Sequence, residues 1–165
     1  MKRLLLILVL MALVMGVMVV PAAAARPIDV GGTWFYVPDD FDPEPTKVAG
    51  QNVFISNGDV GTWANPTPVG LEGISIEAFV VVAHKKHGTY QGRMDFTGEV
   101  DGKAGTLVIK ANGSGPWPPG PGSGDWSGSW VILSGTGDLS NLRGQGSWWG
   151  PLGFLNYDGK VHFTG

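Results

Sequence analysis

The chain has 165 residues, 11 basic and 14 acidic side chains and no cysteine. Its net charge of −3 offers nothing that would attract nucleic acid or an anionic membrane surface. The lack of cysteine excludes disulfide bonds, a lipoprotein anchor, a thiol nucleophile and a cysteine-ligated metal. The seven tryptophans and 27 glycines favour an all-β domain over a disordered chain.

Residues 1–25 have the pattern of a signal peptide. Lys2 and Arg3 precede an uncharged apolar run over 4–20, Pro21 ends it, and four alanines at 22–25 offer a cleavage site. We therefore predict a secreted or extracytoplasmic protein that has no contact with a membrane after cleavage near Ala25. The alternative is an uncleaved anchor, because the run approaches the roughly 20 residues that span a bilayer. Residues 26–165 are predicted to form a single domain with one core.

The first part of this domain is weakly patterned. Extended segments over 30–37 and 47–55 flank the acidic, proline-bearing sequence PDDFDPEP, which predicts a loop. The sequence NGDVG at 57–61 predicts a turn. Two prolines in WANPTPVG at 63–70 predict an irregular connection or a sheet edge, because proline cannot donate to a β-ladder.

From residue 71 to 165 the elements are better defined, and alternation with a period of two becomes clear. One face of the first strand is entirely aliphatic and is predicted to point inward: Ile74, Ile76, Ala78, Val80 and Val82. Its other face carries Glu77. After a turn at 83–88, the return strand places four apolar residues on the inner side: Tyr90, Met94, Phe96 and Val100.

Further hairpins complete the chain. The Asp101-Gly102 pair suits a tight β-turn. It is followed by a strand over 105–111, a proline- and glycine-rich connection over 112–124, and strands over 126–133, 146–149 and 154–163. Between the strands over 126–133 and 146–149, Leu139 and Leu142 lie three residues apart. This spacing predicts a single helical turn that presses both leucines onto one end of the sheet.

The segments number about eight, and none reads as a long helix. A sheet without covering helices must cover itself, and successive hairpins favour an up-and-down arrangement. The predicted fold class is therefore all-β, with a closed or nearly closed antiparallel β-barrel of about eight strands.

The carboxy-terminal motifs also carry a family resemblance. The sequences GEVDGKAGTLVIKANGSG, SGTGDLSNLRGQGSW and LNYDGKVHF, within residues 88–163, resemble a bacterial family of uncharacterised proteins classed with the allene oxide cyclase barrel. Plant allene oxide cyclases and dirigent proteins share that superfamily. The resemblance implies an eight-stranded antiparallel barrel and a possible homo-oligomer. It transfers no catalytic residue, because no motif here aligns with the acidic residues of those enzymes.

Candidate functional residues are those whose side chains would be unusual inside an apolar core or would suit a ligand site. Glu77 is the one carboxylate within a strongly apolar strand, and an inward position would raise its pKa as a general acid or base requires. Against this, an inward aliphatic face would turn Glu77 outward. Five larger side chains either line a cavity for a small apolar or aromatic ligand or fill the core: Tyr90, Met94, Trp126, Trp130 and Tyr157.

Metal and cofactor sites are not indicated. His84 and His87 flank two lysines, whose charge would oppose a divalent cation, so a solvated turn is the favoured interpretation. Three functions remain open: a barrel that binds a small apolar molecule, a cyclase or isomerase acting inside the barrel, and a packed barrel serving as a structural or oligomerising module.

Overall fold

The computed structural model describes residues 26–36, 45–48, 52–119 and 122–164, so the predicted signal peptide over 1–25 lies outside the described residues. Within these ranges the chain forms nine strands and no helix. The strands are β1 (Ile28–Tyr36), β2 (Pro45–Val48), β3 (Asn52–Ala64), β4 (Leu71–His84), β5 (His87–Val100), β6 (Lys103–Pro116), β7 (Trp126–Gly137), β8 (Leu142–Gly150) and β9 (Phe154–Phe163).

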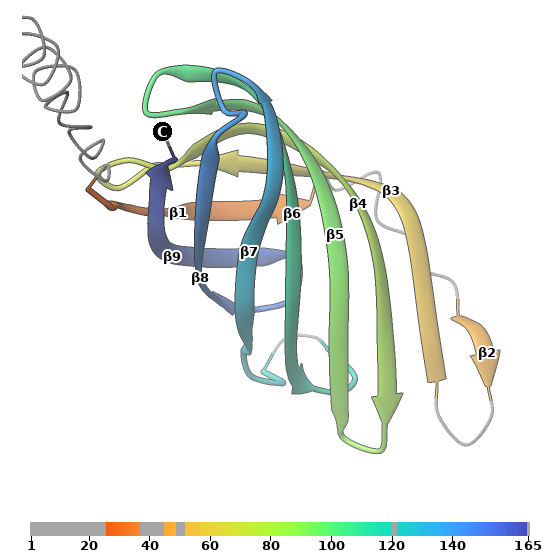
Figure 1. Ribbon diagram of the computed structural model, residues 1–165. Helices are drawn as coiled ribbons and strands as arrows, with labels where there is room; N and C mark the ends of the chain where they lie inside the picture. Colours follow the sequence, from red (N-terminus) through yellow and green to blue (C-terminus); the bar gives the residue numbers. More distant parts are fainter. Residues whose placement is uncertain (1–25, 37–44, 49–51, 120–121, 165) are drawn as a thin grey trace, which may run out of the picture.

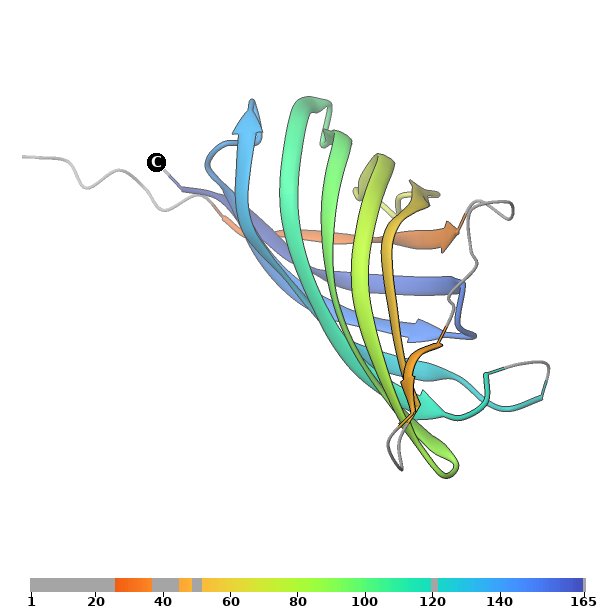
Figure 2. The same ribbon diagram turned by 90° about the vertical axis from the view of Figure 1, so that its right-hand side faces the viewer.

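Eight of the strands close into a ring (Figures 1 and 2). Each strand from β3 to β9 pairs antiparallel with the next, and β1 pairs with β9 on one side and with β3 on the other. β2 pairs with β3 and lies outside the ring. This arrangement confirms the prediction of an all-β, nearly closed antiparallel sheet of about eight strands. We call β1 and β3–β9 the eight-stranded ring.

The inner face of β5 is the one that the sequence predicted. Tyr90, Met94 and Phe96 of β5 are buried, as are Leu107 of β6 and Tyr157 of β9. Intervening polar residues face solvent on β5, because side chains alternate between the two faces of a strand.

The predicted inner face of β4 is wrong. Ile74 and Ile76 are 52% and 55% exposed, whereas Ser75 and Glu77 are 0% and 1% exposed. The physical reason lies in two tryptophans that pack inside the ring next to Ser75. Trp63 and Trp34 donate their indole N–H groups to Ser75 Oγ over 2.9 and 3.3 Å. Buried indole N–H groups need acceptors, which an isoleucine in the place of Ser75 would not supply.

The predicted turn at 57–61 is also wrong, because β3 runs through it. The register between β3 and β4 shifts between Asn57 and Asp59. Gly58, with φ of 100°, adopts a backbone conformation that suits glycine. The local glycine and asparagine signal therefore marks a β-bulge within one strand rather than a chain reversal.

The turn between β7 and β8 closes one end of the ring. Leu139 and Leu142 are both fully buried. The turn contains successive backbone bonds of the i→i+3 type, from Leu139 N to Thr136 O and from Leu142 N to Leu139 O, over 3.2 and 3.0 Å. The predicted pair of inward leucines is confirmed, although the turn is too short to form a helix.

We expect Leu139→Ala to destabilise the fold by about 2–5 kcal/mol, because the substitution leaves a cavity in a fully packed region. The free energy of unfolding from urea titration measures the effect. Leu133→Ala, at a side chain that is 48% exposed, is the matched control and should change stability by less than about 0.5 kcal/mol. Equal losses of unfolding free energy in the two variants would contradict the role of Leu139 in covering one end of the ring.

Candidate functional site

A carboxyl group clamped by two phenols lies inside the ring. Glu77 projects inward from the middle of β4 and is 1% exposed. Tyr36 of β1 donates a hydrogen bond from Oη to Glu77 Oε2 over 2.6 Å, and Tyr90 of β5 donates from Oη to Glu77 Oε1. Of the two orientations that the sequence left open for Glu77, the structure shows the inward one.

Asp59 adds a second carboxyl to this site. It is 5% exposed and lies directly opposite Glu77 in the register of β3 and β4. The bulge at Gly58 changes the register just before Asp59, so that its side chain falls on the buried face. Asp59 Oδ2 is buried and has no hydrogen-bond partner among the described residues. We call Tyr36, Asp59, Glu77 and Tyr90 the Glu77 cluster.

Gly92 makes the space for the clamp. A Cβ atom on this inward glycine of β5 would lie 2.7 Å from Glu77 Oε1 and would overlap the Tyr90 hydroxyl group. Any larger residue would therefore push the phenol of Tyr90 away from the carboxyl group. The glycine is required here for space rather than for its backbone conformation.

The environment shifts the protonation of the cluster. Desolvation by burial raises the pKa of Glu77 to about 7; the hydrogen bonds from Tyr36 and Tyr90 lower it, and the nearby Asp59 raises it further. Burial and the charge of Glu77 raise the pKa values of Tyr36 and Tyr90 well above their ordinary value. Both phenols consequently stay protonated at neutral pH, while Glu77 populates both of its states.

An aromatic cavity of about 30 Å³ adjoins the cluster at Tyr90. Its lining is Trp34, Trp63, Tyr90, Met94, Ala111, Trp130, Trp148, Leu155 and Tyr157. A cavity of this volume holds one or two molecules of the size of water. A ring-sized ligand would require at least one aromatic side chain to move.

Four of the five residues predicted to line a ligand site meet at this cavity: Tyr90, Met94, Trp130 and Tyr157. Trp126 does not reach it. Its fully buried ring packs against Trp117, with centroids 6.5 Å apart, and its indole N–H donates to Pro116 O over 3.1 Å. The structure thus brings Glu77 together with most of the predicted aromatic residues.

Other members of the site were missed from the sequence. Tyr36 and Asp59 belong to the weakly patterned part of the chain, as do Trp34 and Trp63. A usable signal was the alternation of Trp34 and Tyr36, which places both side chains on one face of β1. Their rings are in edge-to-face contact, with centroids 4.5 Å apart.

The two histidines that flank the lysine pair lie at the turn between β4 and β5, away from the middle of β4 where Glu77 lies. His84 and His87 are exposed and face each other across the turn between β4 and β5. No three His, Asp or Glu side chains lie close enough to hold a metal ion within the described part of the chain. The same part of the chain contains no helix that is long and apolar enough to cross a membrane.

Comparison with known proteins gives a family match without a function. Residues 70–149 match the family described as "Protein of unknown function (DUF3224)". A solved structure of a DUF3224 protein of unknown function, from Shewanella oneidensis MR-1, is similar in fold, with a TM-score of 0.65 and 18% sequence identity over 85% of this chain and 99% of that one. None of the curated proteins matches. The DUF3224 match covers β4 to most of β8, and therefore includes Glu77 and Tyr90.

The shifted pKa of Glu77 predicts a pH-dependent stability. Between its ordinary pKa of 4.5 and its folded pKa of about 7, the folded state keeps a proton that the unfolded state releases. The free energy of unfolding should therefore decrease as the pH rises through this window, by about 3 kcal/mol in total. Urea titrations at several pH values between 4.5 and 8 measure this decrease.

Glu77→Gln should remove this part of the pH dependence, because glutamine does not titrate. Glu72→Gln, at an exposed position of the same strand, is the control and should keep the wild-type slope. A Glu77→Gln variant with the full wild-type slope would contradict the assignment to Glu77.

Proposed function

We propose that this chain binds a small, mainly apolar molecule in the aromatic interior of the ring, with the Glu77 cluster as its polar anchor. The observation that supports the proposal is a carboxyl group, 1% exposed, held by two phenols beside an aromatic cavity. A buried carboxyl group that only stabilised the fold would be costly, because an apolar residue of similar size needs no desolvation. Secretion and membership of the allene oxide cyclase superfamily, both predicted from the sequence, belong to the same proposal.

The chemistry of the cavity restricts the ligand. Aromatic and aliphatic side chains dominate its lining, so apolar surface is favoured. Tyr90 is the lining residue that also contacts Glu77. A ligand with one hydroxyl or carbonyl group would place that group on the Tyr90 hydroxyl and its apolar part against the tryptophans.

The same arrangement supports acid–base chemistry, as in an isomerase or cyclase. The pKa of Glu77 is near neutrality, so at neutral pH some molecules carry Glu77 as a carboxylic acid and others carry it as a carboxylate base. In the acid direction, the ligand oxygen takes the Tyr90 proton while Tyr90 takes the proton of Glu77. In the base direction the two transfers are reversed, and no further reactant is needed.

Binding can be tested with phenol, indole and cyclohexanone, by tryptophan fluorescence and calorimetry. These probes are ring-sized, so each enters the cavity of about 30 Å³ only if an aromatic side chain of its lining moves. Ala111→Val should weaken the binding of a probe about tenfold or more, because Ala111 lines the cavity and the added methyl groups fill it. Ala104→Val, at an exposed position of the same strand β6, should leave the affinity unchanged. Circular dichroism checks that both variants keep the fold.

The outcome separates the proposal from its alternatives. Binding that Ala111→Val weakens and Ala104→Val does not would support the interior site. Glu77→Gln should then keep most of the affinity while any proton exchange with the probe is lost. If none of the three probes binds at millimolar concentration, or if Ala111→Val binds as well as the wild type, the proposal is wrong.

A second candidate function, self-association, is favoured by the outer face of β4. Ile74, Ile76 and Val80 are between 36% and 55% exposed on this face, and Ile55 of β3 adds a further 42% exposed side chain. We call these four residues the aliphatic stripe. Contiguous apolar surface of this kind marks an interaction site in soluble proteins.

The partner that fits the aliphatic stripe is a second copy of the chain. The outer positions of β4 from 74 to 82 carry no charge, and the neighbouring Arg93 and Asp95 of β5 pair with each other over 3.1 Å. The exposed Lys110 of β6 borders this surface but lies outside the stripe, so the four stripe residues themselves offer a partner no charge. The aliphatic stripe of one molecule can pack against the aliphatic stripe of a second copy in a contact with twofold symmetry.

Sedimentation equilibrium tests this contact. The wild type should form a dimer or larger oligomer, and Ile76→Lys should shift it to the monomer, because association would bury an unpaired charge. Ser129→Lys, at an exposed position of β7 that is separated from β4 by β5 and β6, is the control. A wild type that stays monomeric at about 100 micromolar would contradict self-association. A dissociation constant of that size corresponds to an association free energy of only roughly 5 kcal/mol.

A further inference from the structure

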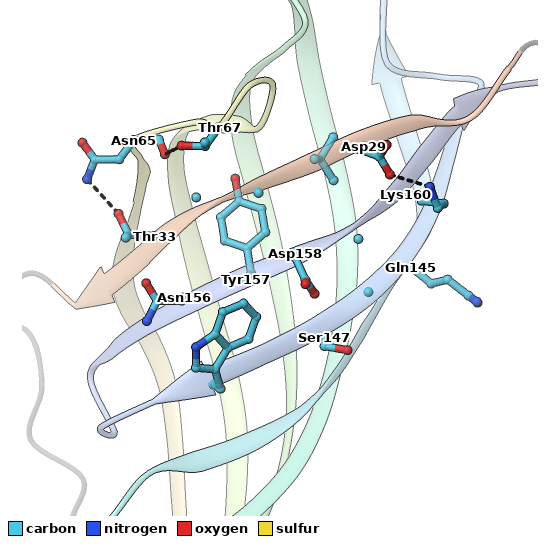
Figure 3. A pocket seen from close by; sticks show the side chains of 16 residues that line it. Asp29, Thr33, Asn65, Thr67, Gln145, Ser147, Asn156, Tyr157, Asp158 and Lys160 are labelled. Carbon is cyan, nitrogen blue, oxygen red and sulfur yellow. Dashed lines mark hydrogen bonds and ion pairs between the residues drawn. The ribbon is translucent and has the colours of Figure 1, made fainter.

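A broad groove crosses the outer face of β1, β9 and β8 (Figure 3), and Tyr157 contributes to the lining of both this groove and the interior cavity. Its volume is about 780 Å³. We propose that this groove binds a neutral saccharide, with Trp149 as the stacking surface. This inference is independent of the Glu77 cluster, whose side chains face the interior.

The groove is built from side chains in register on three neighbouring strands. Thr33, Asn156 and Trp149 form one row across β1, β9 and β8, and Asp158 and Ser147 lie in the next row. Neighbouring strands are about 5 Å apart, so that hydrogen-bonding groups recur at that interval. One ring-sized polyol can therefore contact two or three of these side chains at once.

One wall of the groove is fixed by the connection between β3 and β4. Thr67 donates its backbone N–H to Gly31 O over 3.1 Å, and Gly31 donates its own to Val69 O over 2.9 Å. Asn65 Nδ2 donates to Thr33 Oγ1 over 2.9 Å (Figure 3). These bonds hold the wall against β1 before any ligand arrives, which reduces the entropy lost on binding.

The end of β3, from which this wall continues, approaches β1 closely because residue 32 is glycine. A Cβ atom there would lie 2.7 Å from the backbone oxygen of Ala64 and 2.9 Å from the Tyr157 hydroxyl oxygen. A larger residue would push the wall off the strand. The glycine thus shapes one side of the groove from within the sheet.

Trp149 supplies an apolar surface among polar groups. Its side chain is 41% exposed, although tryptophan is usually well buried. Phe154, 50% exposed and stacked on Phe35 with centroids 6.0 Å apart, continues the aromatic surface beyond Asn156. A sugar ring has one face of C–H groups and a rim of hydroxyl groups, so it suits an aromatic plane bordered by hydrogen-bonding side chains.

The charges of the groove favour a neutral ligand. Lys160 is the only basic residue of its lining, and it is paired with Asp29 (Figure 3). The exposed carboxylate of Asp158 would repel an anion and can accept hydrogen bonds from two hydroxyl groups. The polar lining is equally unsuited to a hydrocarbon ligand. A polyol with an apolar ring face carries no charge, offers hydroxyl groups to the polar side chains and presents an apolar surface to Trp149.

The test uses hexasaccharides of neutral glucan, xylan, mannan and chitin, with calorimetry and saturation-transfer NMR on the full folded domain. At least one hexasaccharide should bind the wild type. Trp149→Ala should weaken that binding about tenfold or more, whereas Trp149→Phe should keep most of it, because a smaller aromatic plane remains. Ile76→Ala, outside the groove, should bind like the wild type.

Asp158→Ala is the second variant and should also weaken binding, through the loss of an acceptor for sugar hydroxyl groups. Both substituted side chains are exposed, so the fold should survive, and unfolding curves confirm it. Failure of all four hexasaccharides to bind at millimolar concentration would overturn the proposal. So would binding that both Trp149→Ala and Asp158→Ala leave unchanged. Neither result bears on the interior site, which the binding of phenol, indole and cyclohexanone tests separately.

Discussion

The burial of one carboxyl group among aromatic rings organises the interior of this protein. An isolated carboxylate in such surroundings would be strongly unfavourable, so Glu77 must either hold a proton or receive hydrogen bonds. Tyr36 and Tyr90 provide those bonds from two different strands, and Gly92 leaves the room for them. The positions of β1, β4 and β5 are therefore linked through a single group. Closure of the ring by β1 is what brings Tyr36 within reach.

The same requirement explains why the sheet exposes aliphatic residues and buries polar ones on β4. The indole groups of Trp34 and Trp63 need Ser75 as an acceptor, and the phenols need Glu77. The same face of β4 also buries Leu71, Phe79 and Val81, so the inward face supplies both the hydrogen-bond acceptors and apolar contacts. The outer surface is left with two contrasting faces, the aliphatic stripe on β3 and β4 and the polar groove on β1, β9 and β8.

Sequence reasoning could predict the fold class, the hairpins and the buried turn with Leu139 and Leu142, because these depend on local alternation and turn chemistry. It could show which residues of β4 share a face, but not which face is inside. That choice depends on tryptophans of β1 and β3, up to 41 residues away in the chain. The bulge at Gly58 resembles a turn locally, and its nature is decided by pairing with β4. Glu77 was therefore a candidate from sequence, whereas Tyr36 and Asp59 were not.

A direct test of the central claim is the pKa of Glu77, from the pH dependence of its side-chain carboxyl carbon signal in NMR spectra of the folded domain. Assignment of the signal rests on its loss in Glu77→Gln. The account predicts a midpoint of about 7, with the ring signals of Tyr36 and Tyr90 shifting over the same pH range. A midpoint near the ordinary value of 4.5, with no response from the two tyrosines, would show that Glu77 is solvated and would contradict the account.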